Sequence, residues 1–227
     1  MRYRAASALG TLLSCVMVVG VSTTAAEDSR PESALSLEIL LTIAPSLPAA
    51  ARAPLLDEAT RIWQSQGVSI DWLSATAPPR VANKSLRVLV VPRRGSGARQ
   101  NDSLAVGELL GPSKGHAVAI VSIEAAKRMV EEARPPGFPL LAPPDCRRLG
   151  LVLGRAVAHE IGHYLLDTPT HARHGLMRPR FDAREFSDLR PGTFALDPDA
   201  SQWLKDRFLR QTGVTHVVQP ARFSYAR

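Results

Sequence analysis

The spacing of apolar residues changes several times along the chain, and each spacing predicts an element. Apolar and polar residues alternate in residues 35–39, which is typical of a strand with one buried face. Apolar residues three and four apart, as at Leu55, Ala59 and Ile62, are typical of a helix that buries one face. Strands are expected at residues 35–43, 68–72, 86–91, 104–110 and 117–123, and helices at residues 49–66, 124–133 and 147–166 and from Pro198, which follows the capping residue Asp197.

The order of these elements predicts a single α/β domain. The strand–helix–strand opening is typical of a sheet covered by helices. Gly67 follows the first predicted helix as a stop signal, and residues 111–115 form a Gly- and Pro-containing loop between two strands. The five prolines of residues 135–144 predict an irregular connection before the helix expected at residues 147–166.

The first 26 residues have the layout of a secretory signal peptide. Arg2 and Arg4 precede an apolar run over residues 5–21, and small residues lead to a cleavage site near Ala26. An uncleaved anchor helix and a lipoprotein signal with Cys15 lipidated are the weaker alternatives, because the run is short for a membrane span and continues past Cys15. We expect a secreted or periplasmic protein with one domain at residues 27–227.

Charge and cysteine content limit the function classes. The 28 basic residues include Arg2 and Arg4, so cleavage leaves 26 basic residues against 21 acidic ones. No nucleic-acid-binding motif accompanies this charge, which instead favours attraction to an anionic cell envelope. Cys146 is the single cysteine outside the signal, so no internal disulfide can form and the core, or a metal, must supply the stability. No feature of the sequence indicates an oligomeric state.

Four of the six histidines lie within residues 156–177. His159 and His163 are four residues apart, so a helix presents both imidazoles on one face, a spacing that suits Zn²⁺. Glu160 lies one step round that helix, where it could take a proton from a water molecule beside the metal. Two histidines leave zinc underligated, so a later residue must supply a third ligand.

The residues alone leave the third ligand open. His171 follows a turn that Pro169 makes possible, and Gly175-Leu176-Met177 permits a second bend. The candidates are His171, His174, Asp167 and Glu185.

The run from His159 to Met177 resembles the metzincin branch of the zincin metallopeptidases, and within it a group of small exported bacterial metzincin-like proteins. Those proteins pair His-Glu-x-Gly-His with a later histidine and a Gly-(Ile/Leu)-Met turn. The longer metzincin motif, His-Glu-x-x-His-x-x-Gly-x-x-His, is altered here, because Leu166 replaces the glycine and His171 comes eight residues after His163 rather than six. The resemblance implies that His171 is the third zinc ligand, with Met177 beneath the metal.

The resemblance also implies an α+β zincin fold. It has a twisted mixed sheet with an antiparallel edge strand at residues 104–110, an active-site helix, a methionine turn and a C-terminal helix. The expected activity is that of an exported zinc-dependent metallopeptidase acting on peptide or protein substrates, with Glu160 as the catalytic residue and zinc on His159, His163 and His171. The alternatives are a thermolysin-like zincin with Glu185 as third ligand and an extracytoplasmic binding module that contains zinc without peptidase activity.

Overall fold

The computed structural model describes residues 35–74, 85–92, 106–111, 116–135, 143–190 and 194–211. By its contacts, Ser33–Arg227 forms one unit separate from Met1–Glu32. The expected signal peptide at residues 1–26 and its alternatives therefore lie outside the described residues. Among the helices that are described, none combines the length and apolar character needed to span a bilayer.

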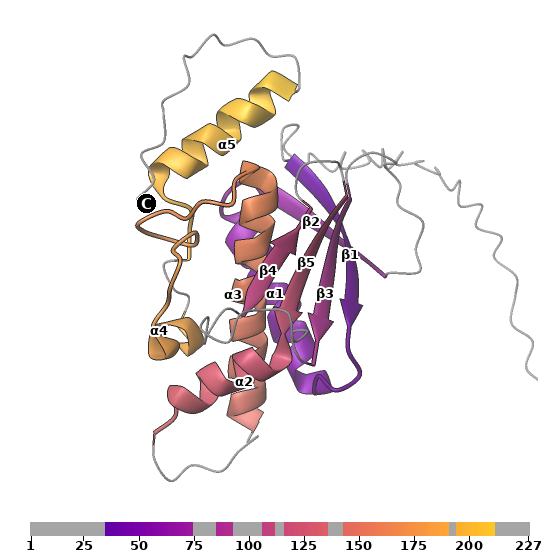
Figure 1. The fold of residues 1–227 in the computed structure, drawn as a ribbon, viewed down its shortest axis with the longest axis vertical. Helices are drawn as coiled ribbons and strands as arrows, with labels where there is room; N and C mark the ends of the chain where they lie inside the picture. Colours follow the sequence, from indigo (N-terminus) through magenta and orange to yellow (C-terminus); the bar gives the residue numbers. More distant parts are fainter. Residues whose placement is uncertain are drawn as a thin grey trace, which may run out of the picture. The chain divides into compact units, whose positions relative to one another are not determined.

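A five-stranded mixed sheet forms one layer of this unit (Figure 1). The strand order is β2-β1-β3-β5-β4, in which the first four strands run parallel and β4 is antiparallel to β5. The strands are β1 (Leu35–Ile43), β2 (Val68–Ser74), β3 (Ser85–Val91), β4 (Gly107–Leu110) and β5 (His116–Ser122). The predicted α/β class is confirmed, and so is the mixed sheet with an antiparallel strand at its edge.

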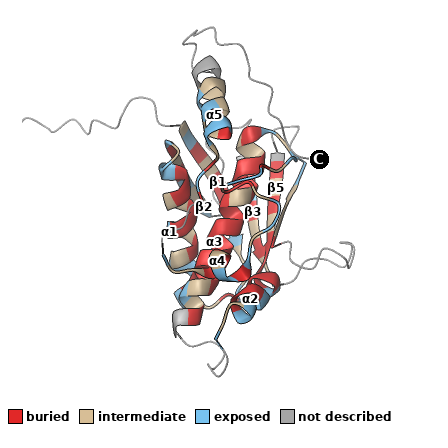
Figure 2. Cartoon of the chain, turned by 90° about the vertical axis from the view of Figure 1, so that its left-hand side faces the viewer, coloured by how far each residue is buried: buried red, intermediate tan, exposed pale blue. Residues whose placement is uncertain are grey.

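Two long helices, α1 and α3, pack against each other over one face of the sheet (Figures 1 and 2). The helices are α1 (Ala49–Gln64), α2 (Ile123–Glu132), α3 (Pro143–Leu166), α4 (Ala183–Ser187) and α5 (Pro198–Gln211). A Cβ atom at Gly150 or Gly154 would lie 2.5 Å from a backbone carbonyl oxygen of α1. Glycine at these two positions of α3 therefore permits the close approach of the two helices.

The core lies between the sheet and these helices, where strand residues at alternate positions meet the apolar face of α3. Ile39, Val88 and Ala119 from three neighbouring strands are fully buried, as are Val152 and Ile161 of α3. Figure 2 shows α3 as buried along most of its length. A helix held so firmly is a rigid support for the histidines that it carries.

The element boundaries depart from the prediction in a few places. Helix α3 starts at Pro143, inside the stretch expected to be irregular, because proline fits the first turn of a helix, where its missing N–H has no helical partner. Helix α1 ends at Gln64, two residues early, and Gly67 follows with a positive φ of 76°. Helix α4 was not predicted. The C-terminal helix begins as expected, and the Asp197 carboxylate accepts a hydrogen bond from the Ala200 N–H at 2.8 Å.

Candidate metal centre

Three imidazoles from two segments of the chain converge on one point. The Nε2 atoms of His159 and His163, one turn apart on α3, are separated by 3.0 Å. His171 follows the helix, and its ring centroid lies 5.3 Å from that of His159 and 4.9 Å from that of His163. One ligand atom from each residue lies within 4.8 Å of the other two. Tetrahedral zinc needs nitrogens separated by roughly 3.3 Å, so the cluster is close to that geometry.

Hydrogen bonds on the outer side of the two helix histidines determine which ring nitrogen faces the cluster. His159 Nδ1 lies 2.7 Å from the Leu176 carbonyl oxygen, and His163 Nδ1 lies 2.8 Å from that of Thr168. A carbonyl only accepts, so each Nδ1 donates its proton and each neutral ring keeps a lone pair on Nε2. The two Nε2 atoms, each with a lone pair, are 3.0 Å apart. A cation bound between them would stabilise this arrangement.

Burial favours the neutral form of all three imidazoles. Desolvation is the main cause that lowers the pKa of His159 to about 3, and the neighbouring His163 and His171 lower it further, against the effect of the Leu176 carbonyl. The pKa values of His163 and His171 are also lowered, in both cases chiefly by burial. Neutral imidazole is the form that binds a metal ion, so the environment favours ligation over protonation.

A tight turn at the end of α3 brings His171 to the cluster. Asp167 has a positive φ of 52°, the left-handed conformation that commonly ends a helix. The Thr168 N–H donates to the His163 carbonyl at 3.3 Å, which closes the last turn. Beyond His171, the Ala172 N–H donates to the Met177 carbonyl at 2.8 Å. Residues 172–177 thus form a closed loop beside the histidines.

Met177 packs against α3 on the backbone of Gly162. It is 1% exposed, and a Cβ atom at Gly162 would lie 2.3 Å from its sulfur, so the glycine of the motif leaves room for this methionine. Gly175 has a positive φ of 71°, and a Cβ atom there would collide with the Ala195 carbonyl oxygen at 2.4 Å. The Leu176 N–H donates to the same carbonyl at 2.7 Å, which holds the methionine turn.

The Glu160 side chain extends from α3 to the edge strand β4. It is buried, and a Cβ atom at Gly107 would lie 2.5 Å from Glu160 Oε1. The carboxylate therefore rests against the bare backbone of β4. Glu160 lies on α3 between His159 and His163 in the sequence, and these two histidines belong to the cluster.

The other candidate ligands lie apart from this cluster. The group of possible metal ligands found among the described residues includes neither His174, Asp167 nor Glu185. His174 is exposed, and the Asp167 carboxylate pairs with Arg207 at 3.5 Å. The Glu185 carboxylate forms an ion pair with Arg178.

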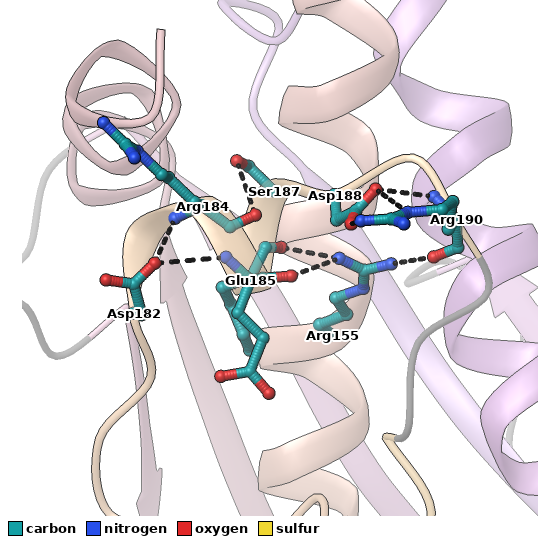
Figure 3. A network of polar contacts seen from close by, with 8 residues as sticks. Arg155, Asp182, Arg184, Glu185, Ser187, Asp188 and Arg190 are labelled. Carbon is teal, nitrogen blue, oxygen red and sulfur yellow. Dashed lines mark hydrogen bonds and ion pairs between the residues drawn. The ribbon is translucent and has the colours of Figure 1, made fainter.

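Sequence reasoning missed Arg155, whose side chain is completely buried. Its guanidinium donates to Glu58 Oε1 at 2.8 Å and to the carbonyls of Phe186 at 2.8 Å and Arg190 at 3.3 Å. Figure 3 shows Arg155 reaching the backbone of α4, while the Glu185 carboxylate points away from it. The one signal in the sequence is an arginine within the apolar run 149–158.

A cluster of phenylalanines links Arg155 to the histidines. The Phe181 ring stands edge-on to His159, with centroids 6.3 Å apart, and packs on Phe186 and Phe194 at 4.6 and 5.6 Å. The Arg155 guanidinium carbon lies 4.3 Å from the centroid of Phe194. Arg155 therefore supports one wall of the histidine cluster at a distance.

A scan against models of known protein families gives no match to this chain, and a search of curated proteins gives none either. The assignment of a function therefore depends on the residues of the site.

Proposed function

We propose that this chain is an exported zinc-dependent peptidase, in which His159, His163 and His171 bind the metal and Glu160 is the catalytic residue. The observation that carries the proposal is the pair of Nε2 lone pairs that face each other at 3.0 Å, with both Nδ1 protons donated to backbone carbonyls. His171 adds a third nitrogen to the same group. Export is supported by the apolar run and small residues of the N-terminal segment.

The donor set suits zinc in a catalytic rather than a purely structural site. Three neutral imidazoles are a common ligand set for catalytic zinc, whereas structural sites are usually closed by a fourth protein ligand. Among the described residues, the ligand group contains three side chains. Zinc, when bound, polarises a carbonyl group and stabilises the negative charge that develops on its oxygen.

Glu160 supplies the proton transfers that peptide hydrolysis requires. A carboxylate held beside the ligands takes a proton from water as the water oxygen attacks the peptide carbonyl carbon. The same carboxyl group then returns the proton to the leaving amine as the C–N bond breaks. Because the Glu160 side chain is buried between α3 and β4, its carboxylate has little freedom to move away from the edge strand.

The free edge of β4 offers a site for an extended peptide. The Ser122 N–H donates to the Val106 carbonyl at 2.8 Å, and the register pairs Gly107 with Val121. Residues of an antiparallel pair alternate between facing the partner strand and facing away, so Gly107 and Leu109 direct their N–H and C=O groups away from β5. Within the described residues β4 is the last strand of the sheet, and a substrate strand added there would run past Glu160.

Hydrolysis of a peptide library, with and without a chelator, tests the proposal. We expect cleavage that the chelator abolishes and added zinc restores. Glu160→Gln keeps the size of the side chain but cannot accept the proton, so it should retain zinc and lose about 10²-fold or more in rate. Glu185→Gln is the matched control and should retain both zinc and activity.

Three outcomes would overturn parts of this proposal. Loss of zinc in Glu185→Gln would favour the thermolysin-like ligand set. Wild-type turnover in Glu160→Gln would remove Glu160 from the mechanism. Absence of cleavage in the wild type, on a library that a control metallopeptidase cleaves, would favour the zinc-containing binding module.

A further inference from the structure

The contact between Gly107 and Glu160 joins two elements that are distant in the sequence. A Cβ atom at Gly107 would lie 2.5 Å from Oε1, 2.9 Å from Cγ and 3.0 Å from Cδ of Glu160. All three atoms belong to the carboxylate end of one side chain, and the nearest contacts include no backbone atom. A side chain at position 107 would therefore displace the carboxylate while leaving the backbone of β4 and α3 in place.

Position 107 has no requirement of its own for glycine. Gly67, Gly111 and Gly175 have positive φ angles, whereas Gly107 does not. It is the first residue of β4 and pairs with Val121, and glycine in a strand is unfavourable because it has no side chain to pack. The contact with Glu160 is thus the feature of the structure that accounts for glycine here.

We propose that Gly107 is a positioning residue, whose missing side chain lets the edge strand hold the Glu160 carboxylate in its working position. The proposal rests on the proposed function for its effect on hydrolysis. The contact itself is independent of any activity. Gly107 has two properties that bear on the site: its α-carbon lies against Glu160, and its N–H and C=O groups face the free edge of the strand.

The test substitutes Gly107→Ala and measures kinetics and metal content. Displacing a catalytic group by about 1 Å costs roughly 10²-fold in rate, so kcat should fall by about that factor. KM should change little and zinc content should stay the same, because the substitution touches neither the ligands nor the outward-facing backbone groups. Arg52→Ala is the control, since Arg52 is exposed on α1, away from both β4 and the histidine cluster, and its substitution should leave both parameters unchanged.

A double-mutant cycle in thermal unfolding provides a readout that does not need activity. In the Glu160→Ala background the space beside Gly107 is open. Gly107→Ala should therefore lower Tm less there than in the wild type. We expect a difference of about 2–4 °C between the two backgrounds. Equal Tm changes would overturn the proposal, even if the protein proves to be a peptidase.

The two sets of outcomes separate this proposal from the proposed function. If the wild type cleaves no peptide, the proposed function fails, while the difference in Tm still decides whether Gly107 positions Glu160. If the wild type cleaves and Gly107→Ala retains its kcat, the positioning role is wrong and the peptidase proposal stands. If Gly107→Ala does not fold, folding of Gly107→Ala in the Glu160→Ala background supports the contact, and failure there contradicts it.

Discussion

Substitution of Arg155 by methionine should destabilise the protein by about 3–5 kcal/mol, the usual cost of breaking a buried ion pair. The Arg155 and Glu58 side chains are 1% and 5% exposed, and Nε lies 2.8 Å from Oε1. Methionine fills similar space but donates no hydrogen bond to Glu58 or to the carbonyls of Phe186 and Arg190. A total stability of 5–15 kcal/mol is typical of a domain, so the loss is a large part of it.

Arg61 provides the comparison, because it binds the same carboxylate from the surface. Its Nε lies 2.9 Å from Glu58 Oε2, but its side chain is 42% exposed. Solvent screens such a pair, so Arg61→Met should cost no more than about 1 kcal/mol. Urea unfolding of both variants, with zinc supplied in excess, measures the two losses. Equal losses would refute the inference that the burial of Arg155 determines its contribution.

Two further predictions concern Gly162 and Glu58. Gly162→Ala should weaken zinc binding despite alanine's better helix propensity, because its Cβ atom would lie 2.3 Å from Met177 Sδ. Isothermal titration with zinc measures the affinity, and an unchanged affinity would contradict the prediction. Burial raises the pKa of Glu58, but hydrogen bonds from Arg61 and Arg155 outweigh burial and hold it below 4.5. The stability from this carboxylate is therefore present above pH 4.5 and is lost as the pH falls through its lowered pKa, so in acid the wild type should lose more unfolding free energy than Glu58→Gln.

The spacing of apolar residues predicted those helices and strands that depend on residues close together in the sequence. Alternation of apolar and polar residues identified β1, and helical spacing of apolar residues identified α1. The start of α3 differs from the prediction because Pro143 and Pro144 lie in the first turn of the helix, where proline is tolerated. Helix α4 has five residues, too few for an apolar period to develop.

The site was predictable where its residues are near in sequence and not where they are distant. The spacing of His159 and His163 is a property of one helix. The contact of Gly107 with Glu160 depends on how β4 packs against α3, 53 positions away in the chain. The bond of Arg155 to Glu58 spans 97 positions. Such pairs are brought together by the packing of the core, which apolar periodicity does not specify.

Zinc content of the purified protein and its histidine variants is the most direct test of the central claim. Elemental analysis should find about one zinc per chain in the wild type and in His174→Ala, whose side chain is exposed and outside the cluster. His159→Ala, His163→Ala and His171→Ala should each lose most of the metal. Full zinc content in the His171 variant, or loss of zinc in the His174 variant, would contradict the three-histidine centre.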